Sequence, residues 1–324
     1  MLLLCAAPSY SAGGVSAVVT FTKGKVSVLK PGTKTWEALK TGQFVYQGDT
    51  VRTGPASRAG ITYTGGIENR LNANTTFKVE PEELANTGEG NKIQMLFGKV
   101  WTKILRKGTK FQIHTPVAVC SVRGTEYETD VSDNGHTDVK VYDGVVEFSN
   151  EFGSKNIDKN SKSSCDAGSP PADPQPMSSG DKDSWQDEMN TTGAIKLESA
   201  GDLTVGGAQD GTLTVLDKKG KTDDKYAKKI TITSDNQAVS FSPAGAESWA
   251  GKLEAEPAAG IIAFRVKLTG AAGAAGVSVT AAGDGLGATM LSLNVKTVQV
   301  KNLKVKLKTG DGKDKELLLK FKAK

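Results

Sequence analysis

The sequence predicts an all-β protein made of two domains. Short runs of alternating apolar and polar residues recur along most of the 324-residue chain, and many of them are separated by some of its 37 glycines. Alternation with a period of two is typical of a strand with one buried face, whereas an amphipathic helix repeats every 3.6 residues. One stretch near the middle is rich in Ser, Pro, Asp and Gly, the composition of a linker. A chain of this length can bury two separate cores.

Residues 1–17, MLLLCAAPSYSAGGVSA, predict a secretory signal peptide. A short apolar run is followed by small residues, and Val15-Ser16-Ala17 offers a small-x-small cleavage site. No basic segment precedes the apolar run, which leaves open a signal truncated at its N-terminus. The remaining chain has no apolar stretch of about 18 residues, so no transmembrane helix is expected. We therefore expect an extracytoplasmic location, in the periplasm or at the cell surface.

Residues 18–160 predict the first domain. AVVTFTKGKVSVL predicts two strands around Lys23-Gly24, and QFVYQGDTVRTG predicts two more around Gly48-Asp49. A hairpin turn is expected at Asn134-Gly135; a helix-loop-helix calcium site is disfavoured because its twelfth position would be Val141, which has no carboxylate. Further strands are expected in RAGITYTGG, NTTFKVEPEE, KIQMLFGKVWTKI, TKFQIHTPVAVCSV, TEYETDV and TDVKVYDGVVEFSN. Both a short β-solenoid and a sandwich satisfy this pattern.

Residues 161–194 predict a linker that contains a short helix. They hold two basic and six acidic residues, whereas the segments on both sides are net basic. Asp181 to Met189 could form one or two helical turns, capped by Ser179 or Asp181.

Residues 195–324 predict a second domain of regularly spaced strands with glycine turns, the pattern of a β-sandwich. Within it, KNLKVKLK from Lys301 to Lys308 alternates lysine with other residues, mostly apolar. We favour an edge strand protected by its lysines over a grip on an anionic polymer.

Composition argues against several classes of function. The formal net charge of +5 invites a nucleic acid partner, but no aromatic platform is interleaved with the basic residues and no nucleic-acid motif is present. The only two histidines, His114 and His136, fall in neither a Ser/His/Asp motif nor a metal-ligand spacing. We therefore expect no nucleic acid partner, no enzyme activity, no catalytic residue, no bound metal and no cofactor.

Two cysteines remain in the predicted mature chain, Cys120 and Cys165. In an oxidising compartment they could form a disulfide. A buried thiol at Cys120 with an unrelated exposed thiol at Cys165 is the alternative, since sequence does not give their separation.

The first domain resembles the FecR-type domain. The resemblance rests on GKVSVL, on GQFVYQGDTVRTGPASRAGI from Gly42 to Ile61, on LFGKVWTKI, on FQIHTPVAVCSVRGTEYETDV from Phe111 to Val131, and on TDVKVYDGVVEFSN. It implies an extracytoplasmic module; well-known members relay the state of an outer-membrane transporter to a cytoplasmic sigma factor. The second domain resembles a bacterial immunoglobulin-like repeat through GVSVTAAGDGLG, from Gly276 to Gly287.

Five residues of the first domain predict a structural clamp between β layers: Asp49, Arg52, Arg123, Gly124 and Thr125. Gly48-Asp49 predicts a tight turn that Arg52 could tie to a neighbour. Gly124 would let the backbone bulge, so that Arg123 could donate hydrogen bonds to carbonyls or to a carboxylate such as that of Asp49 or Glu126. We favour this structural role over a ligand site.

The combined pattern predicts an exported, non-enzymatic binding module of the cell envelope whose partner is an envelope protein or a glycan. A purely structural component of the surface is the main alternative. Signalling of the FecR type is disfavoured because the sequence shows a signal-like start and no membrane span. A glycan partner would call for exposed aromatic rings, and the candidates are Trp36, Tyr46, Tyr63 and Trp101.

Overall fold

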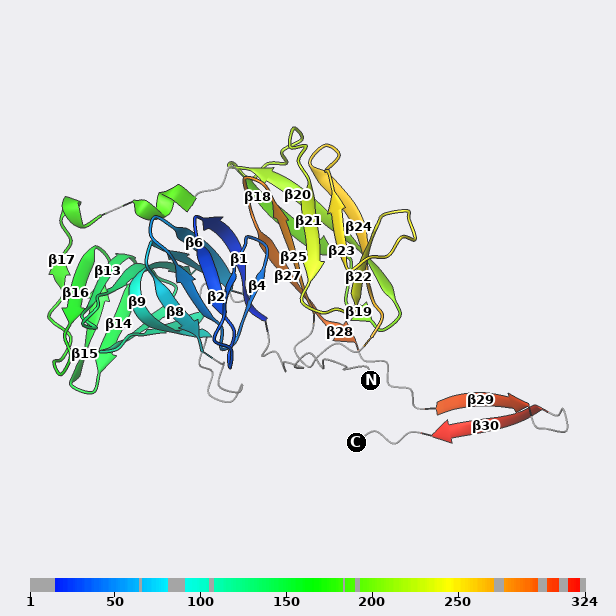
Figure 1. Ribbon diagram of the computed structural model, residues 1–324, viewed down its shortest axis with the longest axis horizontal. Helices are drawn as coiled ribbons and strands as arrows, with labels where there is room; N and C mark the ends of the chain where they lie inside the picture. The colour runs from blue at the N-terminus through cyan, green and yellow to red at the C-terminus, as the bar shows by residue number, and fades with distance from the viewer. Residues whose placement is uncertain are drawn as a thin grey trace, which may run out of the picture.

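The computed structural model describes residues 15–63, 66–80, 91–104, 108–182, 184–189, 193–270, 277–296, 302–308 and 314–320. They form two β-sandwich domains that lie side by side and are joined by a short helical connector (Figure 1). The all-β prediction is thus confirmed. Of the predicted signal peptide, residues 1–14 lie outside the described residues. Residues 15–17 begin the first strand, so the predicted boundary after residue 17 falls inside an element.

Two facing sheets that share one long strand form the first domain. Sheet A consists, in spatial order, of β4 (Phe44–Tyr46), β1 (Val15–Lys23), β6 (Arg58–Tyr63), β7 (Ile67–Leu71), β9 (Asn91–Ile104), β12 (Glu126–Val131), β13 (Thr137–Asp143), β16 (Ser161–Cys165) and β17 (Gln175–Pro176). Sheet B consists of β3 (Trp36–Ala38), β2 (Val26–Leu29), β5 (Thr50–Thr53), β8 (Thr76–Val79), β9, β10 (Lys110–His114), β11 (Val119–Arg123), β14 (Val145–Asn150) and β15 (Gly153–Asp158).

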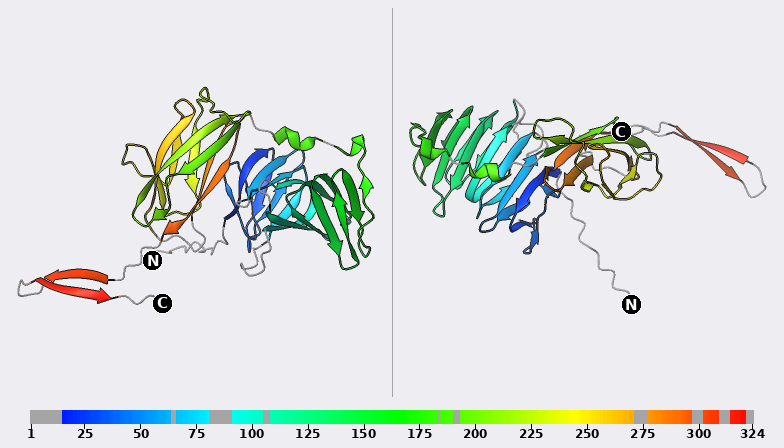
Figure 2. Two further views of the ribbon diagram at one scale, coloured as in Figure 1. Left: turned by 180° about the vertical axis from the view of Figure 1, so that it is seen from behind. Right: turned by 90° about the horizontal axis from the view of Figure 1, so that it is seen from above.

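The chain advances along both sheets in one direction, as the colour gradient in Figure 2 shows. The first half of β9 pairs with β8 and β10 in sheet B, and its second half pairs with β7 and β12 in sheet A. The described pairs of this domain are antiparallel apart from β9–β10. The domain is therefore a sandwich whose strands follow one another as the turns of a solenoid do, and it combines features of both predicted alternatives.

Two of the predicted turns connect strands in different sheets rather than two strands that pair with each other. The turn at Lys23-Gly24 carries the chain from β1 in sheet A to β2 in sheet B, and the turn at Gly48-Asp49 carries it from β4 to β5. Gly48 has φ +84°, a left-handed conformation that glycine adopts without steric cost. The hairpin at Asn134-Gly135 is confirmed, because β12 and β13 pair directly, with Val131 opposite Thr137.

The core of the first domain lies between the two sheets. Alternation along the strands turns every second side chain inward, as in β7, where Ile67, Asn69 and Leu71 are buried. The largest fully buried side chains include Tyr63, Phe77, Phe111, Tyr127 and Phe148.

The first domain extends beyond its predicted end at residue 160. Strand β16 pairs with β13, with Cys165 opposite Thr137, and β17 adds to the edge of β16. The serines and lysines of SKSSC suit the polar outer face of an edge strand, which made this segment resemble a linker in sequence. The connector is shorter than predicted and contains two 3-10 helices, η1 (Ser179–Asp181) and η2 (Trp185–Met189). At the start of η1, the Asp181 carboxylate accepts hydrogen bonds from the backbone N–H and the hydroxyl of Ser178, both at 2.7 Å.

The second domain is a sandwich with its own core, which includes Phe241, Phe264, Ile232 and Val279. One sheet contains β22 (Val239–Pro243), β24 (Ile261–Leu268), β20 (Ala208–Asp217), β18 (Gly193–Ser199) and β26 (Leu286–Gly287). The other contains β23 (Lys252–Ala255), β21 (Ile230–Ser234), β25 (Val277–Gly283) and β27 (Thr289–Leu293). A small pair is formed by β19 (Leu203–Thr204) and β28 (Val295–Lys296).

The C-terminal lysine-rich segment forms a strand, β29 (Asn302–Lys308), which pairs with β30 (Asp314–Lys320) in a separate two-stranded sheet (Figure 1). Lys301 and the side chains of both strands lie outside the described residues, so the role of the lysines stays a prediction.

Candidate binding site between the domains

A groove follows the junction of the two domains as three neighbouring hollows of about 740, 520 and 290 Å³. We call them the upper, middle and lower hollow. The upper and middle hollows share Thr20 and Phe21. The middle and lower hollows are lined by the consecutive Thr41 and Gly42, and by residues of the same strand, β21. The walls come from β1–β4, β6 and β7 of the first domain, from η2 of the connector, and from β18, β20, β21 and β25–β27 of the second domain.

A β-bulge in β1 directs Phe21 into this groove. Val19 pairs with Ile61 and Phe21 with Gly60, so Thr20 and Phe21 together face a single residue of β6. A Cβ atom built on Gly60 would lie 2.8 Å from Thr20 Oγ1 and 3.2 Å from Phe21 Cβ, which places both side chains on the same face. Regular alternation would have turned Phe21 into the core together with Val19. The bulge instead leaves the ring half-buried at the centre of the groove.

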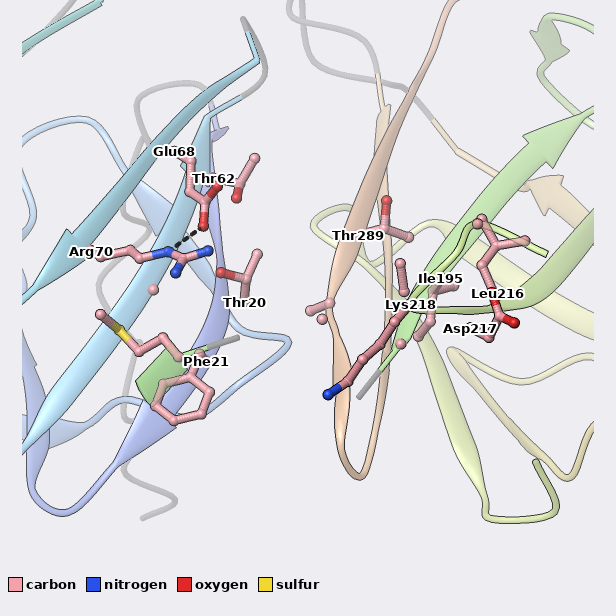
Figure 3. Close-up of a pocket in the computed structure, with 17 residues that line it drawn as sticks. Thr20, Phe21, Thr62, Glu68, Arg70, Ile195, Leu216, Asp217, Lys218 and Thr289 are labelled. Atoms are coloured by element: carbon pink, nitrogen blue, oxygen red, sulfur yellow. Dashed lines mark hydrogen bonds and ion pairs between the residues drawn. The ribbon is translucent and has the colours of Figure 1, made fainter. Parts of the chain in front are cut away.

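Figure 3 shows the upper hollow, with Phe21, Glu68 and Arg70 on the first-domain wall and Lys218 and Thr289 on the second-domain wall. Arg70 Nε lies 2.7 Å from Glu68 Oε1, and its Nη1 donates to the Gln186 carbonyl at 2.7 Å. The guanidinium also lies 4.9 Å from the ring centroid of Trp101. Because these contacts hold Arg70 from several sides, it forms a rigid part of the wall.

The connector is fixed to the outer face of sheet A beside the groove. Trp185 donates its indole N–H to Glu128 Oε2 at 2.6 Å, and Lys23 pairs with Glu188 at 3.1 Å. Met189 is buried and lines the upper hollow. These contacts hold η2 against the first domain and so fix the point from which the chain enters the second domain.

Aromatic rings and a buried carboxylate stand at the lower hollow. The rings of Phe44 and Tyr46 have centroids 6.4 Å apart, and Lys30 Nζ lies 4.8 Å from the Tyr46 centroid. Lys30 also pairs with the fully buried Asp49 at 2.7 Å. Burial, followed by the negative charges of Asp235 and Asp49, raises the pKa of Tyr46. Asp235 belongs to the second domain, and the neighbouring Thr233 and Ser234 line the lower hollow opposite Tyr46.

The charges that line the groove cancel. Two acidic and two basic side chains line the upper hollow, and one of each lines the middle and the lower hollow. Seven threonines also contribute to the lining: Thr20, Thr22, Thr41, Thr62, Thr231, Thr233 and Thr289. The groove therefore presents hydroxyl groups and aromatic rings, with no net charge among its lining side chains.

The predicted clamp residues do not come together as one unit. Asp49 accepts hydrogen bonds from Lys30 Nζ and from the Tyr46 N–H at 2.9 Å, and the Arg52 guanidinium lies 3.7 Å from the ring centroid of Trp36. Arg123 ends β11 as an exposed side chain, so its predicted bonds to Asp49 or Glu126 are wrong. The physical reason is that Arg123 follows the inward-facing Val122 and therefore points to the outer face of sheet B.

Gly124 and Thr125 form a corner rather than a bulge inside a strand. Gly124 has φ +85° at the crossing from β11 in sheet B to β12 in sheet A. The buried Thr125 donates its hydroxyl to the Val145 carbonyl at 2.8 Å, which ties the corner to β14. This corner repeats the arrangement at Gly48-Asp49, where a left-handed glycine also precedes a buried polar side chain.

Cys120 and Cys165 are free thiols, and both are buried. The predicted disulfide is therefore not formed in this structure, and Cys165 is not the exposed thiol of the alternative. Burial raises the pKa of Cys120 to about 12 and also raises that of Cys165.

Of the four aromatic residues considered for a glycan, Tyr63 and Trp101 are buried, whereas Trp36 and Tyr46 are half-buried. Tyr46 alone lines the groove. Phe21 was missed because strand alternation assigns it to the core; the signal that could have identified the bulge is Gly60, a glycine within the RAGITY strand.

In the described part of the chain, no three His, Cys, Asp or Glu side chains are grouped so as to hold a metal ion. The same residues include no helix with the length and apolar character needed to cross a membrane.

Residues 49–147 match the FecR protein family, so the chain carries a FecR domain. None of the curated proteins compared with the chain matches it. Among solved structures, a protein assigned as an anti-sigma factor from Parabacteroides distasonis is similar at 16% identity, over 40% of this chain and 59% of that one, with a TM-score of 0.35. The chain thus spans less than two thirds of that protein.

Two further solved structures are similar to this chain. A β-glycosidase from Bacteroides vulgatus has 10% identity over 68% of this chain and 24% of that one, with a TM-score of 0.27. A cohesin module from a family 33 glycoside hydrolase of Clostridium perfringens has 12% identity over 34% of this chain and 100% of that one, with a TM-score of 0.20.

Proposed function

We propose that this protein is an exported, non-enzymatic binding module of the cell envelope, and that its FecR domain and second sandwich together form the binding site. The proposal rests chiefly on the bulge that directs Phe21 into the groove between the domains. A half-buried aromatic ring turned away from an available core is the kind of group that anchors a partner.

The wall chemistry supports binding rather than catalysis. The paired Glu68 and Arg70 neutralise each other, and Asp217 accepts hydrogen bonds from the backbone N–H groups of Lys219 and Lys221 at 2.8 and 2.9 Å. Groups engaged in this way shape a surface, whereas a general acid or base needs a pKa tuned to proton transfer. The signal-like residues 1–17 support export.

A pull-down tests the proposal. The full chain is immobilised and exposed to solubilised envelope proteins and to envelope glycans at low and high salt. Thr289→Arg places a long cation in the groove, and Thr212→Arg makes the same change at an exposed strand position that does not line it. We expect salt-resistant retention by the wild type and Thr212→Arg, and its loss in Thr289→Arg.

Two outcomes would contradict the proposal. Equal retention by all three proteins would show that the groove is not the binding site. Absence of retention, together with self-association of the wild-type chain, would favour the structural alternative. Export is tested separately, by mass spectrometry of the N-terminus of protein recovered from the envelope fraction.

A further inference from the structure

The lining of the groove points to the chemistry of its ligand. The upper and middle hollows share Thr20 and Phe21, and the lower hollow lies beyond the close approach of Gly42 to Ala282, so a ligand that reaches all three is extended rather than compact. Aromatic rings occur at two places along this path, Phe21 where the upper and middle hollows meet and the Phe44–Tyr46 pair at the lower hollow. Threonine hydroxyls, which can both donate and accept hydrogen bonds, line all three hollows.

The balance of charges in the lining favours an uncharged polymer as the ligand. Each hollow has as many acidic as basic side chains. Several of these charges already have partners, as in the Lys30–Asp49 and Lys228–Asp284 pairs at 2.7 and 2.6 Å. A polyanion would gain little from a lining whose own charges balance, because the strongest electrostatic attraction comes from the charges that the ligand meets directly. The binding of an uncharged polymer does not depend on such attraction.

A peptide segment suits the groove less well than a sugar chain. An extended peptide usually adds a strand to an open sheet edge, where main-chain groups are free to pair. In the middle hollow, however, the strands present side chains: β1 already pairs with β4 and β6, and β21 with β23 and β25. Aromatic rings and hydroxyl groups instead match the two surfaces of a pyranose, its apolar C–H face and its hydroxyl rim.

We propose that the groove between the domains binds a neutral, linear oligosaccharide chain, with Phe21 and the Phe44–Tyr46 pair as stacking surfaces. This inference rests on the proposed binding function and specifies its ligand class. On this view, the bulge at Thr20 and Phe21 turns the Phe21 ring out of the core so that it can stack against a sugar ring.

Isothermal titration calorimetry and saturation-transfer NMR on the full chain test this ligand class. The probes are cellohexaose, laminarihexaose and chitohexaose as neutral chains, and hexagalacturonate as an anionic chain. We expect at least one neutral hexasaccharide to bind, with an affinity that hardly changes with salt, and hexagalacturonate to bind at least about tenfold more weakly.

Three variants locate the site. Phe21→Ala should weaken binding about tenfold, the loss expected for one stacked ring. Phe152→Ala removes a ring that is 52% exposed in the turn between β14 and β15, at the opposite end of the sandwich, and should bind as the wild type does. Thr289→Arg should abolish binding and serves as a second blocking variant if Phe21→Ala folds poorly.

The outcomes separate the two proposals. If no neutral hexasaccharide binds but envelope proteins are retained through the groove, the sugar inference fails and the binding function stands. If neither class binds, both proposals fail. Tighter, salt-sensitive binding of hexagalacturonate, or neutral binding that is unaffected by Thr289→Arg, would also overturn the inference.

Discussion

The indole N–H of Trp185 lies 2.6 Å from Oε2 of Glu128, a carboxylate that is 1% exposed on the outer face of sheet A. Lys99 and Lys140 lie 3.5 and 3.3 Å from the other oxygen of this carboxylate. A buried charge is tolerated only when it is paired and hydrogen-bonded, so Trp185 completes a site that the FecR domain alone leaves partly open. The connector is in this way part of the first domain.

Trp185→Phe tests this relationship. The change keeps an aromatic ring but removes the donor, and we expect a loss of stability of about 1 to 3 kcal/mol and faster proteolysis within the connector. Trp249→Phe is a matched control, because Trp249 also donates to a glutamate, Glu247 at 2.9 Å, but that carboxylate is exposed. Urea unfolding and limited trypsin digestion measure both effects. Equal losses in the two variants would contradict the role assigned to the Trp185–Glu128 contact.

The Lys30–Asp49 pair predicts an asymmetric response to mutation. Lys30→Met leaves the fully buried carboxylate of Asp49 without its cation, and we expect a loss of about 3 to 5 kcal/mol. Asp49→Asn keeps an acceptor for the Tyr46 N–H and leaves Lys30 able to reach water, because its side chain is 27% exposed. A smaller loss, about 1 to 3 kcal/mol, is therefore expected. Chemical denaturation measures the loss of folding stability in each variant. A larger loss in Asp49→Asn than in Lys30→Met would contradict the view that Lys30 mainly compensates the buried carboxylate.

His136 predicts a pH-dependent contribution to stability. Its Nδ1 lies 2.6 Å from Asp166 Oδ1 and its Nε2 lies 3.5 Å from Asp138 Oδ2, and the hydrogen bond to Asp166, with the nearby negative charges, raises the pKa of His136 above 6.5. Because the folded-state pKa is the higher one, the contribution is fully present below pH 6.5 and is lost as the pH rises through the folded-state pKa. It is small, since an exposed pair is worth about 0 to 1 kcal/mol.

Thermal unfolding of the wild type and His136→Gln at pH 6 and pH 8 checks this prediction. Between pH 6 and pH 8, we expect the melting temperature of the wild type to fall by up to about 4 °C more than that of the variant. NMR titration of His136 should give a midpoint above 6.5 that falls in Asp166→Asn. A midpoint at or below 6.5 in the wild type would contradict the contact.

We predict that the Cys120 thiol is chemically inert in the folded protein. Burial raises its pKa to about 12, and the thiolate is the reactive form. At pH 8 we expect iodoacetamide to leave Cys120 unmodified in the native chain and to modify it rapidly in urea. Peptide mass spectrometry distinguishes Cys120 from the other cysteines. Modification of native Cys120 at the denatured rate would show that the core of the first domain opens freely.

Much of the first domain could be predicted from local sequence. Strands β4–β6 and β8–β14 were predicted because inward residues such as Val51, Phe77 and Ile113 alternate with polar ones, and turn glycines separate many of the runs. Strand β7 (Ile67–Leu71), which carries Glu68 and Arg70 of the groove wall, was not predicted. The end of the domain was not predicted, since β16 and β17 are short, polar edge strands. Their burial pattern depends on pairing with β13, which local composition does not encode.

The candidate site was predicted only in part. Tyr46 was considered for a glycan, but Phe21 was not, because a bulge is defined by the pairing of β1 with β6 rather than by β1 alone. Arg123 was expected, on chemical grounds, to donate hydrogen bonds to carbonyls or to a carboxylate such as that of Asp49. The pleat of β11 turned it outward, and Lys30 took the place beside Asp49.

The sequence by itself determined the all-β class, the FecR domain and the tight turn at Gly48-Asp49, because period-two alternation and turn glycines act over a few residues. Only the tertiary structure decided that this turn joins two sheets, that the connector is held through Trp185, and that a neutral groove lies between the domains. Each of these depends on groups far apart in the chain: Trp185 contacts Glu128, and the groove is formed by residues such as Phe21 and Thr289. Such contacts are set by the packing of whole sheets, which no short stretch of sequence specifies.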